Sequence, residues 1–542
     1  MERRTVGGRE IRPATGPETA RPRARTVRRT LAALVACGAV AGGGWALLAS
    51  QRQPARPAAA PAAGALAAVS AGAPASLSGL TALIDDRERL VRAHPRDAAA
   101  WAVLGAAYVE RGRRTADARN YPKAERALRT SLRLRPTGNG AALDGMTALA
   151  VERRDFRAAR AWGEQALKRE PGRWTAYPPL IDAYTGLGDH RAAQRTLDGL
   201  LKLHQGPAAK ARAAGVYWDR GWREDAAAQL SAAAAAATAP AERAEYLEQA
   251  GRIAWERGDR EDALRHFEAA VRLDPDQWAA RVGQGRALAA LGRDVDAVKA
   301  YRRALAHRPC PEYALELGEL YQALGLGPQA RTQYDLLRTR VRQDAAEGVD
   351  DELVLGRFEA DHGDARSAAL RLRVEWQRQP GTAVADALGW ALHRAGQDEE
   401  ALKFAAAATD TAKGGGVRNA LYAYHRGVIE RALDLSGPAR RHLELALRTN
   451  PYFSPLWVPS ARTALADLGE PPVEETPPPS AEEPAPRTAD APSPPAAGEP
   501  PPPPGAGPSR PLTAAPAPPP TEEPAPPSGE VPPPGVAPGP FR

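Results

Sequence analysis

Cysteine, methionine and aromatic residues are scarce in this 542-residue chain. It has two cysteines, Cys37 and Cys310, two methionines and only 6% aromatic residues. So few cysteines exclude a disulfide framework and a cysteine-based zinc site, and they leave the redox compartment undetermined. The nine histidines are scattered along the chain without the spacing of metal ligands. We therefore expect no metal site.

The short motifs that mark common catalytic sites are also missing. The chain has no GxxxxGK(S/T) loop, no HExxH, no GxSxG and no GxGxxG after a strand. Gly283-Gln284-Gly285 supplies only a GxG, inside a predicted helix. Acidic pairs such as Glu399-Glu400 fall where helices are expected to begin, and negative charge is favourable there. We therefore predict a protein that is not an enzyme, with no cofactor and no small-molecule substrate.

The basic residues of the chain are not arranged in a pattern typical of nucleic-acid binding. The formal net charge is +8. Residues 1–30 hold nine Arg and three Glu, residues 471–542 hold three Arg and nine acids, and the remainder has 61 bases against 53 acids. Bases and acids alternate along that remainder, which is typical of a solvated helical surface. We expect no nucleic-acid partner.

The N-terminal region carries a predicted membrane anchor. Residues 1–30 are basic, lack apolar periodicity and are predicted to be disordered. Residues 31–49 contain no charge, and as a helix they would span about 28 Å, enough for a bilayer core. Arg28 and Arg29 precede this run, so the positive-inside rule places the N-terminus in the cytoplasm and the rest of the chain outside. This pattern predicts a single-pass protein of the cell membrane.

Two other interpretations of the same run remain open. The Ala-rich sequence downstream offers loose sites for cleavage of a secretory signal. Leu34-Val35-Ala36-Cys37 resembles a lipobox, in which the cysteine would be acylated. After the apolar run, residues 50–75 are rich in Pro and Ala and are predicted to form a linker. Residues 76–95 are then predicted to form a lone helix that begins the folded region.

A repeated pattern dominates the middle of the chain. Residues 246–309 contain two copies of it, and the key positions of the first copy, Gly251, Gly258, Ala263, Phe267 and Pro275, recur at the same spacing as Gly285, Gly292, Ala297, Tyr301 and Pro309. Small residues suit the contact between two helices, glycine suits the turn, and proline ends the unit. The pattern resembles the tetratricopeptide repeat, a helix–turn–helix unit of about 34 residues. The resemblance implies an all-α solenoid superhelix, because each unit buries its apolar face only by stacking on its neighbours.

Ten units are predicted between residues 96 and 451. The alanine near the start of each second helix recurs at a nearly constant interval. These marker residues are Ala124, Ala159, Ala193, Ala226, Ala263, Ala297, Ala330, Ala368, Ala401 and Ala439. Unit one has an insertion near 113–120, which we expect to form a loop. Unit two has Arg154 in place of the turn glycine, and unit eight has Glu359 and Glu375 at apolar or small positions, so these two units match least well.

The array is predicted to end in a cap and a tail. Residues 452–469 are expected to form a capping helix over the last unit. Residues 470–542 are predicted to be disordered, because proline is abundant and large apolar side chains are few. Proline runs there favour an extended polyproline II conformation.

The family resemblance also implies a binding groove. Tetratricopeptide proteins usually hold their partners on the concave face, through recurrent positions of the first helices. In register, these positions hold Trp218, Arg252, Trp255, Arg286, Glu319, Arg357, Trp390, His393 and Tyr424. Exposed Trp and Arg side chains are typical binding anchors. The competing interpretation is that the Trp side chains fill gaps between Ala-rich helices. The Lys and Asn pattern of the chaperone-binding carboxylate clamp is absent from every unit.

The sequence thus predicts a non-catalytic scaffold that binds a protein or peptide partner in the concave groove at the membrane. The alternative is a soluble secreted or cytoplasmic regulator whose solenoid sequesters a signalling partner.

Overall fold

The computed structural model describes residues 61–410 and 416–469, and this part of the chain is helical throughout. The predicted basic segment (1–30), the predicted anchor (31–49), residues 50–60 and the predicted tail (470–542) lie outside the described residues. No helix within the described ranges is both long and apolar enough to span a bilayer.

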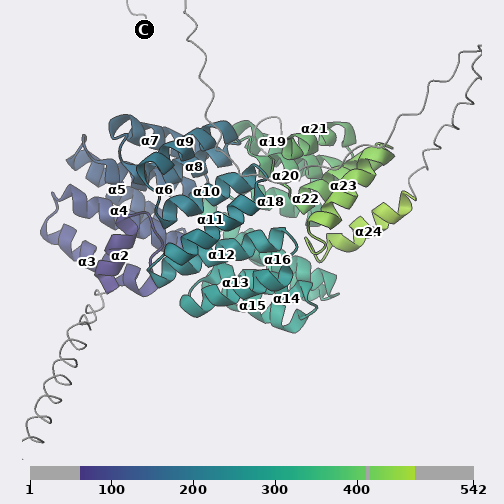
Figure 1. The fold of residues 1–542 in the computed structure, drawn as a ribbon, viewed down its shortest axis with the longest axis horizontal. Coiled ribbons are helices and arrows are strands. Elements are labelled where there is room, and N and C mark those ends of the chain that lie inside the picture. The colour runs from purple at the N-terminus through teal and green to yellow at the C-terminus, as the bar shows by residue number, and fades with distance from the viewer. Residues whose placement is uncertain (1–60, 411–415, 470–542) are drawn as a thin grey trace, which may run out of the picture. The chain divides into compact units, whose positions relative to one another are not determined.

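The ten predicted units are all present as antiparallel helix pairs (Figure 1). In chain order they are α4 (Ala98–Thr115) with α5 (Asn120–Leu134), α6 (Gly140–Glu152) with α7 (Phe156–Arg169), α8 (Tyr177–Gly186) with α9 (His190–Leu203), α10 (Pro207–Asp219) with α11 (Arg223–Ala236), α12 (Pro240–Glu256) with α13 (Arg260–Leu273), α14 (Trp278–Ala290) with α15 (Asp294–His307), α16 (Pro311–Ala323) with α17 (Gly327–Ala346), α18 (Glu352–His362) with α19 (Ala365–Arg378), α20 (Thr382–Arg394) with α21 (Asp398–Thr409), and α22 (Ala420–Ala432) with α23 (Ser436–Thr449). We number these pairs as units one to ten. A short 3₁₀ turn, Trp174–Ala176, precedes α8.

Small residues let the two helices of a unit approach closely. All ten marker alanines are buried, with exposed fractions between 0 and 3%. In unit five, a Cβ added to Gly251 would lie 2.7 Å from the ring of Phe267, so only glycine leaves room for that ring. The repeat pattern therefore reports real helix contacts, as the sequence predicted.

The two units with the weakest match fold like the others. In unit two, Arg154 adopts the left-handed conformation (φ 58°) that glycine adopts in other turns. In unit eight, Glu375 is buried, and Gln379 Nε2 donates a hydrogen bond to its carboxylate at 2.7 Å. The buried carboxylate of Glu375, which departed from the repeat pattern, is thus hydrogen-bonded as buried polar groups usually are.

Two predictions for the start of the array are wrong. Residues 61–75 were expected to be linker, but they include helix α2 (Pro61–Ser70), which packs against α3 (Leu77–Ala93), so α3 is not a lone helix. Alanine is the strongest helix former and proline is tolerated at the first helical position, which explains why this Ala-rich stretch is helical. Of the insertion at 113–120, residues 113–115 lengthen α4, and the expected loop is confined to residues 116–119 before α5 begins.

At the other end, α24 (Trp457–Asp467) packs on α23, as the predicted cap requires. The described array therefore has helical caps at both ends.

The array also turns back on itself along a seam. We define the seam as the set of contacts between the turn inside one unit and the loop that follows the unit five places later. Arg153 O accepts a hydrogen bond from Asp350 N at 3.0 Å, which joins the turn of unit two to the loop after unit seven. The same offset recurs three times. A Cβ added at Gly188 would lie 2.7 Å from Pro380 O, one at Gly221 would lie 2.5 Å from Gly416 O, and one at Gly258 would lie 3.0 Å from Pro451 Cδ. The seam places units two to five beside units seven to ten (Figure 1).

Polar side chains strengthen contacts between distant units. The lengthened α4 brings Arg114 to Asp274, with 2.5 Å between Nη2 and Oδ2, and both side chains are buried. Beside them, Arg113 pairs with Glu245 at 3.2 Å. These pairs hold unit one against unit five, so the insertion seen in the sequence has a structural role.

Candidate functional site

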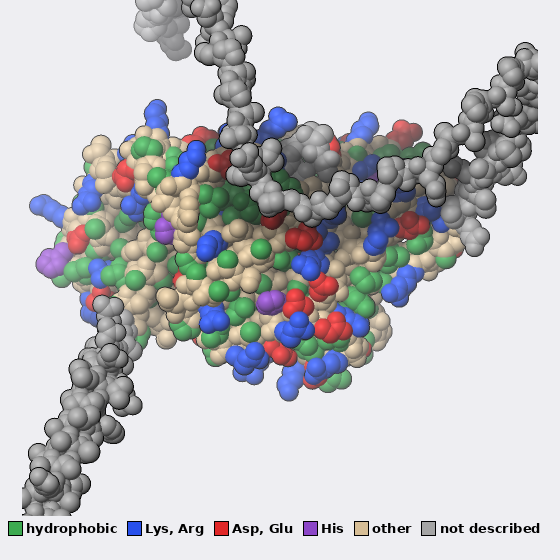
Figure 2. Space-filling view, in the orientation of Figure 1, with side chains coloured by type: hydrophobic (Ala, Val, Ile, Leu, Met, Phe, Trp, Pro, Cys, Tyr) green, Lys and Arg blue, Asp and Glu red, His purple; other side chains and the backbone are tan. Residues whose placement is uncertain are grey.

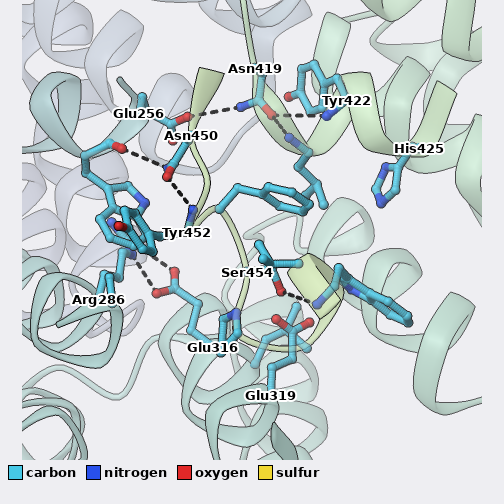
Figure 3. A pocket seen from close by; sticks show the side chains of 18 of the residues that line it. Glu256, Arg286, Glu316, Glu319, Asn419, Tyr422, His425, Asn450, Tyr452 and Ser454 are labelled. Carbon is cyan, nitrogen blue, oxygen red and sulfur yellow. Dashed lines mark hydrogen bonds and ion pairs between the residues drawn. The ribbon is translucent and has the colours of Figure 1, made fainter. Parts of the chain in front are cut away.

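A cavity of about 560 Å³ lies on the inner surface of units five to ten. It is lined by the first helices α12, α14, α16, α18, α20 and α22, and by the chain from Asn450 to Arg462. Figure 3 shows side chains from these helices pointing into the same space. The cavity therefore occupies the concave face on which the repeat pattern placed a groove.

One wall of the cavity is formed by the chain that follows the last unit. Asn450 Nδ2 donates a hydrogen bond to Trp255 O at 2.8 Å, and Asn450 Oδ1 accepts one from Tyr452 N at 2.9 Å. The guanidinium group of Arg260 lies 4.5 Å from the centre of the Tyr452 ring. These contacts carry the segment from unit ten across to unit five, which closes the groove along that side (Figure 3).

The acidic side chains of the cavity already have partners within the protein. Arg286 contacts Glu316 through two hydrogen bonds, each of 2.7 Å. Trp390 Nε1 donates to Asp361 at 2.9 Å. The remaining contacts are His425 with Asp386 at 3.0 Å, Asn419 with Glu256 at 3.4 Å, and His362 with Glu319 at 4.0 Å. Each acid of the cavity thus has a partner, and Glu316 is the one that pairs with an arginine of the lining.

Three arginines of the cavity lack such partners. Arg252, Arg357 and Arg462 are exposed, and within residues 61–410 and 416–469 none of them makes a hydrogen bond or an ion pair. Burial raises the pKa of Glu256, while Arg286 and Arg252 act against this rise. Arg252 therefore influences Glu256 without being bound to it. The guanidinium groups of these three arginines therefore keep their hydrogen-bond donors free, whereas the acids of the lining do not keep all their acceptors free.

Aromatic rings supply the apolar part of the lining. Trp255 and Trp390 expose only 8% and 4% of their surface. Trp390 stacks on His425 with 4.2 Å between ring centres, and its ring also meets that of Trp457 edge to face. Packed rings of this kind form rigid walls, because their orientation is fixed by their neighbours.

The structure brings together six of the nine predicted groove residues. Arg252, Trp255, Arg286, Arg357 and Trp390 line the cavity, together with Glu319. The low exposure of the two tryptophans shows that they also fill space between helices, and their role as binding anchors stays a prediction.

Trp218, His393 and Tyr424 are not part of the cavity lining. Trp218 lies on α10, one unit before the cavity begins, and the guanidinium group of Arg223 covers its ring at 5.1 Å. His393 instead contacts Asp398 at 2.5 Å. Tyr424 is 3% exposed and packs against Phe453, so for this residue the gap-filling interpretation is the right one.

The sequence analysis missed the contribution of the chain after unit ten. Asn450, Tyr452, Trp457 and Arg462 lie outside the first-helix register from which the groove was predicted. The aromatic residues of this segment were a signal that it packs against something. Nothing in its sequence indicated unit five as the partner.

The charges elsewhere on the surface are mixed. Figure 2 shows Lys and Arg side chains interspersed with Asp and Glu across the face in view. Among the described residues, no group of His, Cys, Asp and Glu side chains is arranged to hold a metal ion. The cavity offers unpaired cationic groups beside rigid aromatic walls, an arrangement that suits binding.

Comparison with known proteins identifies the repeat. Residues 248–309 match the tetratricopeptide repeat family model, and these residues are units five and six. No curated protein sequence matches the chain. Similar solved structures include a human IFIT1 dimer with PPP-AAAA, which is 16% identical over 61% of this chain and 78% of that chain, with a TM-score of 0.40. They also include the APC/C hetero-tetramer Cut9-Hcn1 (14% identity, 68% and 76% covered, TM-score 0.36) and pilF of Pseudomonas aeruginosa (22% identity, 40% and 95% covered, TM-score 0.28). The helix pair of units five and six recurs in the eight other units of the described chain, so this is a tetratricopeptide-repeat protein.

Proposed function

We propose that the protein is a non-catalytic scaffold whose cavity holds a carboxylate-bearing segment of a partner protein. The carrying observation is the pattern of pairing among the charged side chains of the lining. Each of its acidic side chains has a partner, whereas Arg252, Arg357 and Arg462 have none among the described residues.

The physical basis is the geometry of guanidinium recognition. An arginine forms two parallel hydrogen bonds to one carboxylate, and such charge-assisted bonds are about twice as strong as neutral ones. The neighbouring walls of Trp255 and Trp390 supply apolar contact area next to these charges. The volume of about 560 Å³ falls within the range of well-formed binding pockets, about 300–1,000 Å³. The cavity can therefore accept several side chains of one extended segment.

An array of synthetic peptides tests this proposal. The array carries peptides of equal length in which Glu is replaced in parallel by Gln or by Lys. We expect the full chain to bind the Glu series best, and the variant Arg252→Ala, Arg357→Ala to bind at least about tenfold more weakly, because a lost charge-assisted contact contributes about 1.5–3 kcal/mol.

The matched control is Arg302→Ala, Arg303→Ala, which removes the same charge from exposed positions of α15 away from the cavity. Equal binding by both double variants would show that net charge alone, and not the cavity, attracts the peptides.

The location of the scaffold is a second part of the proposal. Residues 31–49 are proposed to anchor the chain in the cell membrane, with the repeats on the outer side. The support is the uncharged run and the arginines that precede it. A reporter fused after Leu468, combined with cell fractionation and protease treatment of intact cells, tests this arrangement. A soluble intracellular reporter would reject the anchor and favour a regulator of signalling partners.

A further inference from the structure

Basic side chains are unevenly distributed among the second helices of the array. The helices α5, α7 and α9, which belong to units one to three, together carry eleven Lys and Arg residues and three acids, a net charge of +8. The helices α11, α13 and α15, which belong to units four to six, carry seven of each, so their net charge is zero. Because both sets of helices have the same place in the repeat, the fold itself does not require the excess of bases in units one to three.

The bases of units one to three form one exposed surface, which we call the basic face. All eleven side chains are exposed, and they belong to the second helices of three successive units. In the part of the chain that the structure describes, Arg129 with Glu125 and Arg160 with Glu164 are the ion pairs that these bases make. The positive charge of the face is therefore largely uncompensated. Its members are Lys123, Arg126, Arg129, Arg133, Arg157, Arg160, Lys168, Arg169, Arg191, Arg195 and Lys202.

The later second helices differ in how their charges are paired. The helices α17, α19, α21 and α23 carry twelve bases and seven acids. Arg371 and Arg378 each pair with two acids, and Arg340 and Arg373 each pair with one. Arginines in these units thus hold the structure together through ion pairs, whereas most bases of the basic face have no such role.

The basic face lies at the end of the array that is nearer in sequence to the proposed membrane anchor. Helix α2 packs against α3 and α4, and it lines a hollow together with the loop at 170–175 that follows α7. The folded region therefore begins beside units one and two. Residues 50–60 separate the uncharged run from α2, and eleven residues reach at most about 40 Å when fully extended. An anchor at residues 31–49 would thus keep the basic face close to the bilayer.

We propose that the basic face lies on a bilayer surface with anionic headgroups. The choice of a bilayer as the partner rests on the proposed anchor. Lys and Arg side chains are attracted to anionic headgroups over about one Debye length, which is roughly 8–10 Å at physiological salt. A tether that confines the face near the surface raises its effective concentration there, so individually weak attractions add up. Contact through this face fixes which side of units one to three meets the membrane.

The lysines of the chain provide a test with an internal control. Lys123, Lys168 and Lys202 belong to the basic face, whereas Lys299 and Lys403 are exposed on other helices. The purified full chain is added to preformed vesicles of phosphatidylcholine alone, or of equal parts phosphatidylcholine and phosphatidylglycerol. Mass spectrometry then follows the acetylation of each lysine by a water-soluble reagent, and flotation measures how much of the chain is bound.

We expect the three lysines of the basic face to react at least about threefold more slowly on the mixed vesicles than on phosphatidylcholine, because anionic headgroups draw the face to the surface. Lys299 and Lys403 should react equally on both, and high salt should remove the difference. The variant Arg126→Glu, Arg191→Glu, Arg195→Glu should lose the protection. The matched control, Arg302→Glu, Arg303→Glu, Arg331→Glu, changes the same number of exposed arginines on α15 and α17 and should keep it. Far-UV circular dichroism confirms that both variants are folded.

Equal reactivity of the basic face on the two kinds of vesicle would overturn the proposal. So would equal slowing of Lys299 and Lys403, which would show that the contact is not specific to this face. Protection by heparin but not by the mixed vesicles would also overturn it, and would assign the face to a soluble polyanion. A chain that does not float with phosphatidylcholine alone would reject the anchor separately, since the mixed vesicles still report on the basic face.

Discussion

The substitution Gly381→Ser distinguishes the effect of the seam on stability from the effects of local backbone structure. Gly381 precedes α20 at its N-cap, with φ −77° and ψ 159°, a conformation that serine adopts without strain. Serine is favoured over glycine at this position by a few tenths of a kcal/mol. Replacing glycine also lowers the entropy of the unfolded chain, which contributes about 0.4–1 kcal/mol. Local effects alone therefore predict that Gly381→Ser stabilises the protein.

The seam contact predicts instead that Gly381→Ser destabilises the protein. The new Cβ would lie 2.5 Å from the carbonyl oxygen of Gly186, a backbone atom that moves only with unit three. Forcing extra atoms into a packed contact costs about 1–3 kcal/mol. We therefore expect a net loss of about 1–2 kcal/mol in the free energy of unfolding of the region around the seam.

Hydrogen exchange is the suitable assay, because long repeat arrays can unfold in parts and a single unfolding free energy is then not defined. Amides of units three and eight should exchange faster in Gly381→Ser than in the wild-type chain. Gly172→Ser is the control, since Gly172 lies in the loop after unit two and an added Cβ there would meet nothing within 4 Å. Slower or unchanged exchange in Gly381→Ser would refute the seam.

Three further predictions concern buried charge and the cavity wall. Asp274→Asn should lower the stability of units one and five by about 3–5 kcal/mol, because it leaves Arg114 buried without its partner; faster hydrogen exchange of the amides in these two units measures this, and replacing both residues by apolar ones should recover most of the loss. Burial raises the pKa of Asp219 to about 7, and Arg252 acts against the rise. The contribution of this group to stability is therefore fully present below the unfolded pKa of about 3.9. It is lost as the pH rises to 7. At pH 8 but not at pH 4, the amides of unit four should therefore exchange more slowly in Asp219→Asn than in the wild-type chain, by an amount of order 1 kcal/mol for this partly exposed group; a pH-independent difference would contradict the assignment. Asn450→Leu removes the buried hydrogen bond to Trp255 O, which keeps its bond from Gly258 N, at a cost of about 0.5–1.5 kcal/mol, and limited proteolysis should then cut the cavity wall faster while helix content stays unchanged.

The local fold could be predicted because its signals are local. Gly251 and Phe267 belong to one unit, and their spacing alone indicates that two helices touch. The ten marker alanines repeat that information, so the helix pairs and the unit boundaries followed from the sequence. Helix α2 was missed because its alanines were attributed to the Pro/Ala composition around them rather than to helix propensity.

The seam could not be predicted in the same way. It joins Gly188, in the turn of unit three, to Pro380, in the loop after unit eight. The offset of five units depends on the small rotation between successive helix pairs, summed over many units. No single residue encodes that sum, and Gly381 has the sequence features of an ordinary loop glycine.

The cavity, too, could be predicted from local signals only in part. Arg252, Trp255 and Trp390 were found from the register of the first helices, whereas Asn450 and Arg462 depend on where the last unit meets unit five.

The most direct test of the account is photo-crosslinking from inside the cavity of the full chain in the cells that produce it. A photoreactive phenylalanine analogue replaces Tyr422, which lines the cavity, or Arg302, which lies on the outer surface of α15. We predict that the residue at Tyr422 crosslinks a partner protein, that the residue at Arg302 does not, and that Arg252→Ala with Arg357→Ala abolishes the adduct. An adduct that forms equally from Arg302, or that survives loss of both arginines, would contradict the proposal that the cavity is the binding site.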